Sequence, residues 1–95
     1  MEGRKDDIGK LRATLIPWDA MASVAYVMEY GAKKYGDHNW KQVPNARERY
    51  VNAAHRHWVA MVDGPAYDDE SGVHHAAHAV CCLLFVLWFD MNNTE

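Results

Sequence analysis

Apolar residues recur at intervals of three or four positions along three stretches of the chain, a spacing typical of amphipathic helices. It predicts helices over residues 18–35, 46–62 and 72–90, preceded by a charged N-terminal arm over residues 1–16. No internal repeat, low-complexity tract or interdomain linker interrupts this pattern. The sequence therefore predicts an all-α fold in which residues 1–95 form a single helical domain.

Residues with special backbone or hydrogen-bonding properties mark the expected ends of these helices. Pro17 suits the first turn of a helix, and Gly36 is expected to end the first one. Asn45, followed three residues later by Glu48, has the form of a capping box for the second helix. Ser71 is expected to cap the third.

The third predicted helix lacks a polar face. Its segment AVCCLLFVLWF, which runs from Ala79 to Phe89, is apolar on every side. A helix of this kind has to be covered all round, and two other helices in a chain of 95 residues can hardly do that. We therefore expect a homo-oligomer in which a second subunit completes the cover.

The composition indicates a folded protein rather than a disordered one, since 49% of the residues are hydrophobic. Cys81 and Cys82 are adjacent within the apolar segment, so they are expected to be small buried hydrophobic residues in a reducing compartment. The charged N-terminus lacks the apolar stretch of a signal peptide, and no apolar run reaches the roughly 20 residues of a membrane span. These features predict a cytoplasmic protein with no membrane partner.

Charge is distributed unevenly along the chain. Residues 1–56 contain ten basic and seven acidic residues, a net charge of +3, whereas residues 57–95 contain six acidic residues and no Lys or Arg. A basic half beside an acidic half suits an anionic ligand that carries a metal ion. No basic stripe follows one element, so direct nucleic-acid binding is not expected. Ordinary solvated surface is the alternative explanation for both halves.

The segment VHHAAHA contains three of the six histidines of the chain. His74 and His78 are four positions apart, and His75 and His78 three, so each pair shares one face of a helix. Imidazoles mixed with carboxylates can hold Mg²⁺, Mn²⁺ or Zn²⁺. A hydrogen-bonded core histidine at position 78, with His74 facing solvent, is the alternative.

Residues from all three helices could meet if their apolar faces pack together. The candidates are Glu29 on the first helix, His57 on the second, and Glu70, His75 and His78 at the start of the third. Such a group is either a metal site or a buried polar network. The sequence leaves both alternatives open.

Basic and aromatic residues in the first half of the chain are candidates for nucleotide contacts. The cations that could contact phosphate are Lys10, Arg12, Lys33, Lys34 and Arg56. Trp40 lies in a polar loop beside Asn39, where the two could stack on a base or bond to its edge. Packing of Trp40 over the ends of the helices is the alternative.

Other common chemistries lack their residues. The chain contains no GxSxG, Walker A, GxGxxG or CxxC motif, which argues against serine hydrolases, P-loop proteins, dinucleotide-binding proteins and zinc knuckles. A cysteine nucleophile is not expected either, because both cysteines lie in the most apolar segment.

Taken as a whole, the sequence resembles a family of small phage proteins described as the N-terminal domain of dATP/dGTP diphosphohydrolases. Three ordered blocks, EYGAKKYGDHNW, RH and ESGVHHAAHA, carry the resemblance, with GKLRATLIP before them. It implies hydrolysis of purine deoxynucleoside triphosphates with a divalent metal in phage nucleotide metabolism. The positions that match the family pattern are Lys10, Arg12, Glu29, Lys33, Tyr35, Gly36, Asn39, Trp40, Arg56, His57, Glu70, His75 and His78.

A second group of all-α nucleotide pyrophosphohydrolases uses ExxE and ExxD motifs on paired helices, and this sequence contains neither. Either imidazoles replace some of the carboxylates, or that catalytic machinery is absent. The leading hypothesis is a metal-dependent dATP/dGTP hydrolase with Mg²⁺ or Mn²⁺ as the expected metal and Zn²⁺ as an alternative. The runner-up is a protein that binds a nucleotide or nucleotide messenger and sequesters it intact, and a third possibility is an assembly partner of another phage enzyme.

The leading hypothesis assigns a role to each candidate residue. Glu29, His57 and His78 are the expected catalytic residues, and Glu29, Glu70, His75 and His78 the expected metal ligands. The nucleotide would be bound by Lys10, Arg12, Lys33, Lys34, Asn39, Trp40 and Arg56.

Overall fold

The computed structural model describes residues 3, 6–7 and 9–92 of the chain. They form three α-helices, α1 (Trp18–Tyr35), α2 (Ala46–Asp63) and α3 (His75–Met91). Two short 3-10 turns, η1 (Ala13–Leu15) and η2 (Asn39–Gln42), precede α1 and α2. Within the described residues there is no strand beyond one isolated bridge between Tyr67 and His74, so the expected all-α fold is confirmed.

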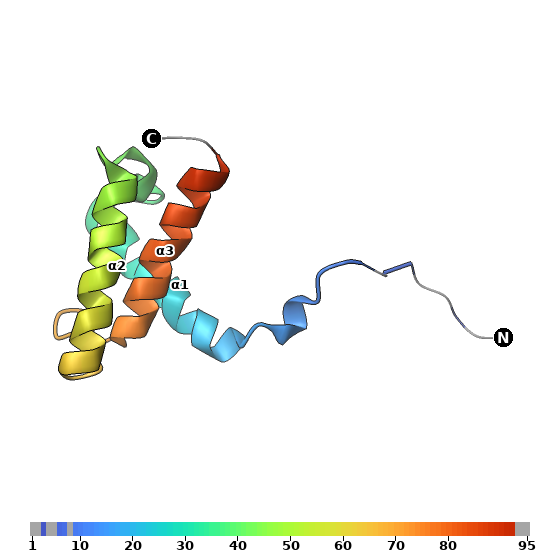
Figure 1. Cartoon of the computed structure of the whole chain (residues 1–95), viewed down its shortest axis with the longest axis horizontal. Coiled ribbons are helices and arrows are strands. Elements are labelled where there is room, and N and C mark those ends of the chain that lie inside the picture. The colour runs from blue at the N-terminus through green and yellow to red at the C-terminus, as the bar shows by residue number, and fades with distance from the viewer. Residues whose placement is uncertain (1–2, 4–5, 8, 93–95) are drawn as a thin grey trace.

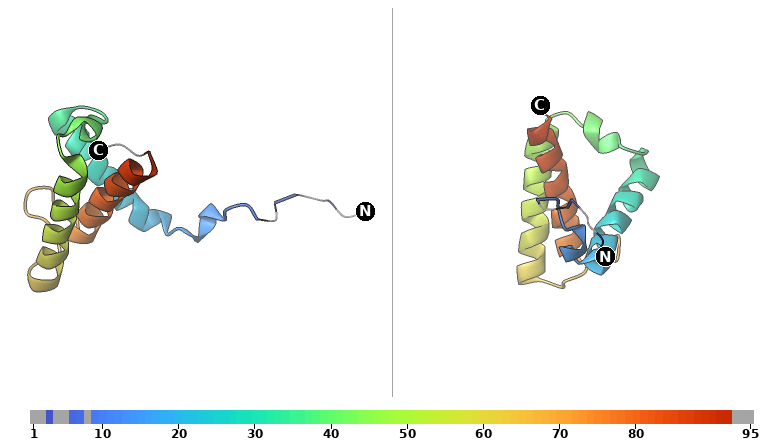
Figure 2. Two further views of the ribbon diagram at one scale, coloured as in Figure 1. Left: turned by 45° about the horizontal axis from the view of Figure 1, so that its top comes forward. Right: turned by 90° about the vertical axis from the view of Figure 1, so that its right-hand side faces the viewer.

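The helices form a small bundle in which α3 packs mainly against α2 and to a lesser extent against α1. Figure 1 shows α2 and α3 side by side with α1 behind them, and the N-terminal arm leading away from the bundle. In the second view of Figure 2, the segment between α1 and α2 arches across the end of the bundle where α3 finishes. None of the described helices is long and apolar enough to cross a membrane.

The first helix occupies the predicted residues. Gly36 ends it in a backbone conformation with φ of +100°, which a glycine adopts without strain, and its N–H bonds to the carbonyl of Ala32. The capping box proposed for α2 is wrong. Asn45 has a left-handed conformation with φ of 54°, and its side chain makes no capping hydrogen bond. A capping side chain needs an extended backbone to reach the free N–H groups of the first turn.

The third helix begins at His75, three residues later than predicted, and Ser71 does not cap it. Residues 68–73 instead form a tight turn in which Gly72 has φ of +74° and donates its N–H to the carbonyl of Asp68. The cap is His74, whose Nδ1 accepts a hydrogen bond from the N–H of Ala76. The side chain of Ser71 is thereby free for the site described below.

The core lies between α1 and α3 and is closed by an aromatic cap. Its buried residues are Val24, Val27, Ala77, Cys81 and Phe85. Trp40 of η2 stacks on Phe85 at 4.2 Å between ring centroids, and Trp88 and Phe89 meet its ring edge-on. Trp40 therefore packs against α3, and its contact with a base stays a prediction.

Both cysteines are free thiols, as expected from their place in the apolar segment. Cys81 is buried, and burial raises its pKa to about 12. Cys82 is half-buried, and burial raises its pKa to about 11. The two thiols are therefore protonated at neutral pH.

Candidate functional site

Three imidazoles from two helices meet at the end of the bundle where α2 finishes and α3 begins. The Nδ1 atoms of His57 on α2 and His75 on α3 are 3.0 Å apart. The ring of His78, one turn further along α3, stacks on that of His57 at 4.4 Å with an angle of 9° between the planes. All three side chains are half-buried. Helical spacing in the VHHAAH segment was the signal that pointed to this group.

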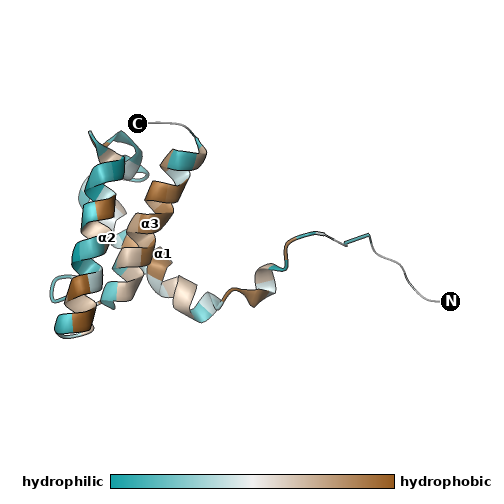
Figure 3. Ribbon diagram, viewed as in Figure 1, coloured by the Kyte–Doolittle hydropathy of each residue, from teal (hydrophilic) through white to brown (hydrophobic). Residues whose placement is uncertain are grey.

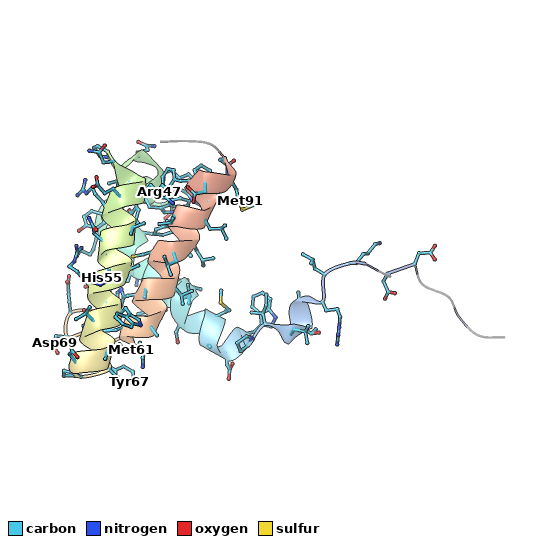
Figure 4. The ribbon with its side chains drawn as sticks, in the orientation of Figure 1. Arg47, His55, Met61, Tyr67, Asp69 and Met91 are labelled. Atoms are coloured by element: carbon cyan, nitrogen blue, oxygen red, sulfur yellow. The ribbon has the colours of Figure 1, made fainter. Side chains whose placement is uncertain are left out.

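The turn between α2 and α3 adds a carboxylate to these rings. Oδ2 of Asp68 accepts hydrogen bonds from the backbone N–H of Ser71 at 2.8 Å and from its hydroxyl at 3.0 Å. These bonds, the backbone one above all, lower the pKa of Asp68, so the group is ionised at neutral pH. In Figure 4 its neighbours Tyr67 and Asp69 lie at this end of the bundle.

His78 is connected to the same carboxylate through Ser71. Nε2 of His78 lies 2.7 Å from the Ser71 hydroxyl and 3.9 Å from Oδ2 of Asp68. One face of the His78 ring thus lies against His57, and its Nε2 contacts the hydroxyl of Ser71, so His78 touches two other members of the group. Burial lowers the pKa of His78 and also that of His57, so both rings are neutral at neutral pH.

Three potential ligand atoms in this group lie close enough together to bind one metal ion. Those of His57, Asp68 and His75 are all within 4.8 Å of one another. Two nitrogen ligands about 2.1 Å from an ion are about 3.0 Å apart at right angles, as in octahedral coordination, and about 3.4 Å apart in a tetrahedral site, so the His57–His75 distance of 3.0 Å fits the octahedral arrangement better. Two imidazoles and one carboxylate suit Zn²⁺, Mn²⁺ and related ions better than Mg²⁺, which prefers oxygen ligands.

Glu70, an expected metal ligand, has another partner. Its Oε2 lies 2.8 Å from the ammonium group of Lys34, which also lies over the rings of Tyr30 and Tyr35 on α1. Hydrogen bonds from Lys34 and then Tyr30 lower the pKa of Glu70. The pair ties the end of α1 to the turn that carries Asp68. In the described part of the chain, no oxygen of Glu70 belongs to a group of three potential ligand atoms that all lie within 4.8 Å of one another.

Glu29 lies in a different place from the imidazoles. It lines a hollow of about 390 Å³ between the end of α1 and η2, together with Tyr35, Asn39 and Trp40. The structure therefore groups Glu29 with the two residues expected to contact a base. Within the described residues it is not part of the group of close ligand atoms.

An adjoining hollow of about 550 Å³ contains two guanidinium groups. Arg49 and Arg56 are seven residues apart on α2 and line it with Asn52 between them, while Asn39 and Gln42 approach from η2. Arg49 donates one weak hydrogen bond, of 3.4 Å, to the carbonyl of Pro44. Arg56 directly precedes His57, so this hollow and the imidazoles lie on neighbouring faces of the same helix.

The remaining predicted cations lie outside these hollows. Lys33 is exposed on α1, and Lys10 and Arg12 are exposed on the arm, away from the bundle (Figure 1). Reasoning from the sequence missed Asp68, Ser71 and Arg49. The i, i+7 spacing of Arg49 and Arg56 was a usable signal, whereas Asp68 stands in a run of three acidic residues with no mark to distinguish it.

Comparison with known proteins agrees with the resemblance noted in the sequence. The family model described as dATP/dGTP diphosphohydrolase, N-terminal, matches residues 1–95. The chain belongs to this family. A dATP/dGTP diphosphohydrolase of Salmonella phage PMBT28 is 40% identical over 93 residues, which are 98% of this chain and 31% of the relative. The chain thus spans about a third of the length of that relative, and no solved structure matches it.

Proposed function

We propose that this chain binds a purine deoxynucleoside triphosphate together with a divalent metal ion and takes part in its hydrolysis. The observation that carries the proposal is the group formed by His57, Asp68 and His75, whose ligand atoms lie within 4.8 Å of one another at one end of the bundle. Membership of a family named for dATP/dGTP diphosphohydrolases supplies the substrate class. The reaction would belong to phage nucleotide metabolism, as the source of the relative suggests.

The residues present fit a divalent ion. His57 offers an unprotonated nitrogen because burial lowers its pKa, and a metal ligand must be unprotonated. Two hydrogen bonds from Ser71 hold the carboxylate of Asp68, and because this group is ionised it can act as a metal ligand. A bound divalent ion would supply a Lewis acid for a phosphoryl oxygen and an acidified water molecule. His78 would act as a positioning residue through Ser71 and His57.

Phosphate groups would be bound by the cations beside this group. Arg49 and Arg56 line one hollow, and guanidinium groups bind phosphate in a bidentate manner. Lys34 is close to the Asp68 turn but is paired with Glu70, so it would have to exchange that partner for a phosphate oxygen. The base would lie in the hollow of Glu29 and Asn39, with Trp40 forming its wall.

Binding without hydrolysis is the second candidate. It is favoured by the lack of ExxE and ExxD motifs, and by the presence of one carboxylate alone among the three close ligand atoms of the described residues. In this case the same residues would hold a nucleotide and its metal ion intact. Both candidates need Asp68, and they differ in whether products form.

The experiment that tests the proposal compares two neighbouring carboxylates. Wild-type protein, Asp68→Asn and Asp69→Asn are incubated with dATP and dGTP plus Mn²⁺, Zn²⁺ or Mg²⁺, and the nucleotides are separated by anion exchange. Asp69 is an exposed neighbour in the same turn, so its variant is the matched control. We expect mono- or diphosphate products from wild type and Asp69→Asn and at least a hundredfold less from Asp68→Asn.

Two other outcomes have defined meanings. If dATP or dGTP disappears from a protein-free filtrate and returns unchanged after denaturation, the chain sequesters the nucleotide and hydrolysis by this chain is wrong. If wild-type protein neither cleaves nor retains either nucleotide with any of the three metals, both candidates are wrong.

A further inference from the structure

Part of α3 is not covered by the rest of the bundle. Cys81, Phe85 and Phe89 are buried against the other helices, but Leu83 and Leu87 are 51% and 52% exposed. Val80 and Met91 continue the same row at helical spacing and are also exposed. Figure 3 shows apolar residues along α3, with the most hydrophilic segments on α2. We call the row formed by Val80, Leu83, Leu87 and Met91 the α3 stripe.

The stripe continues into a groove between α1 and the beginning of α3. This groove encloses about 890 Å³ and is lined mostly by apolar side chains, among them Met21 and Tyr26 of α1. Val80 lines the groove and also belongs to the α3 stripe, so the two form one continuous surface. Tyr67 and Ser71 border its far side, which brings the groove up to the turn that holds Asp68.

The N-terminal arm carries a second set of uncovered apolar residues. Leu11 is 97% exposed and Leu15 68% exposed, and Ile16 is exposed as well, as is Trp18 at the start of α1. Pro17 lines the groove, so the arm starts at one end of it. The arm then leads away from the bundle, and a hydrogen bond from Nε1 of Trp18 to the carbonyl of Ala13 stabilises the turn at its base (Figure 1).

An apolar surface and an apolar segment are thus both uncovered in one molecule, and the segment points away from the surface. Such surfaces are typical of contacts with another protein. The contact would be apolar on both sides, because neither the residues that line the groove nor those of the α3 stripe include a Lys, Arg, Asp or Glu. A second copy of the chain supplies both an apolar arm to cover the groove and α3 stripe, and an apolar groove and stripe to cover the arm.

We propose that two copies of the chain form a symmetric dimer by exchanging their arms, so that residues 11–18 of each copy lie on the groove and α3 stripe of the other. Twofold symmetry makes each copy both donor and acceptor, which closes the assembly at two chains. The arm of one copy would then lie beside the Asp68 turn of the other, because Tyr67 and Ser71 border the groove.

The first test measures the mass of the full chain in solution by size-exclusion chromatography with light scattering. Leu83→Glu/Leu87→Glu charges the α3 stripe, Leu15→Glu/Ile16→Glu charges the arm, and Val62→Glu is the control. Val62 is 60% exposed on α2, outside both surfaces, and all the replaced residues are exposed. Wild type and the control should have the mass of a dimer, twice the 10.9 kDa of one chain. Both double variants should have the mass of a monomer, 10.9 kDa.

Circular dichroism at the helical bands shows whether each variant keeps its fold, and equal spectra are expected because no core residue is changed. A wild-type mass of 10.9 kDa at every protein concentration would overturn the proposal. So would a dimer that persists in Leu15→Glu/Ile16→Glu, since the arm would then take no part in it.

A second test asks which copy the arm contacts. Protein with Leu15→Cys is mixed with a mass-tagged copy that carries Leu83→Cys, and a short thiol cross-linker is added. Wild-type protein measures the background from Cys81 and Cys82, whose raised pKa values keep them protonated at neutral pH. A cross-link between the two different copies is expected. A cross-link confined to single chains in the double variant Leu15→Cys/Leu83→Cys would show that the arm folds back on its own bundle, and would overturn the exchange.

Discussion

At the scale of single residues, the site depends on how one carboxylate is held. Two hydrogen bonds from Ser71 fix the same oxygen of Asp68, and the hydroxyl that makes one of them also contacts His78. A ligand that is fixed before the metal binds loses less conformational freedom on binding, and loss of a group that fixes it usually lowers metal affinity about 10- to 100-fold.

Replacement of Ser71 by alanine removes the hydroxyl and keeps the backbone N–H bond to Asp68. We expect a metal affinity about 10- to 100-fold lower than in wild type, because that is the usual effect of losing a group that orients a ligand. The free energy of unfolding of the metal-free protein should fall by only about 1 kcal/mol, since the hydroxyl makes ordinary half-buried hydrogen bonds.

Isothermal titration with Zn²⁺ and Mn²⁺ measures this effect. Ser23→Ala is the control, because Ser23 is an exposed serine of α1 whose side chain makes no hydrogen bond within the described part of the chain. Equal affinities in wild type and Ser71→Ala would mean that Ser71 does not position a metal ligand.

The residues of the site could be predicted in part from the sequence. Helical spacing pointed to His75 and His78, and the apolar edge of the second helix pointed to His57. Asp68 was out of reach, because three consecutive acidic residues look equivalent until the turn is known. In the structure Asp68 is the acid that reaches the imidazoles, in a turn where Gly72 has a left-handed conformation, and Glu70 pairs with Lys34 instead.

At the scale of the elements, aromatic packing joins the α1–α2 segment to the end of the bundle where α3 finishes. The turn η2 places Trp40 flat on Phe85 and edge-on to two further rings of α3. Aromatic pairs in these geometries stabilise a fold beyond the burial of their area. Trp40 thus connects the α1–α2 segment to the C-terminal half of α3.

Trp40→Ala should lower the free energy of unfolding by about 3 kcal/mol, at the low end of the range for large-to-small changes, because the ring is only half-buried. Urea denaturation followed by circular dichroism measures the change. Trp58→Ala is the matched control, since Trp58 is an exposed tryptophan of α2, and its effect should stay below about 1 kcal/mol. A loss as small for Trp40→Ala as for Trp58→Ala would mean that the ring is held for a ligand and not for the core.

The elements themselves were predictable, and their ends were less so. Periodicity located all three helices, because burial of one face requires it. Both ends of α2 were predicted to within one residue, but its cap was misjudged, as were the cap and the start of α3. Asn45 adopts a left-handed backbone instead of a cap, and Ser71 bonds to Asp68 in the preceding turn.

At the scale of the whole molecule, the uneven charge of the sequence is partly balanced within the fold. Each of the two ion pairs found between Lys or Arg and a carboxylate in the described residues joins the basic half to the acidic half. Lys34 of α1 pairs with Glu70. Arg47 of α2 forms a bidentate ion pair with Asp90 of α3, in which Nε donates to Oδ1 at 2.6 Å and Nη2 donates to Oδ2 at 3.1 Å. Figure 4 shows Arg47 on the side of α2 that faces α3. Both pairs are exposed to solvent, so their main effect is to orient the halves.

The sequence left open whether the imidazoles form a metal site or a polar network, and the stability of the whole molecule distinguishes the two. His57 and His75 lie on different helices and Asp68 in the turn between them, so one ion bound by all three would connect elements that separate on unfolding. At a metal concentration a hundredfold above the dissociation constant, the stabilisation is about 2.7 kcal/mol. For a chain of this size the melting temperature should then rise by roughly 10–20 °C.

The measurement is thermal unfolding of wild type, His57→Ala and His55→Ala in EDTA and in excess Zn²⁺ or Mn²⁺. His55→Ala is the control, because His55 is an exposed histidine two positions away on α2. The rise should be present in wild type and His55→Ala and absent in His57→Ala. If no metal raises the melting temperature of wild-type protein, the three imidazoles are a polar network, and the metal part of the proposed function is wrong.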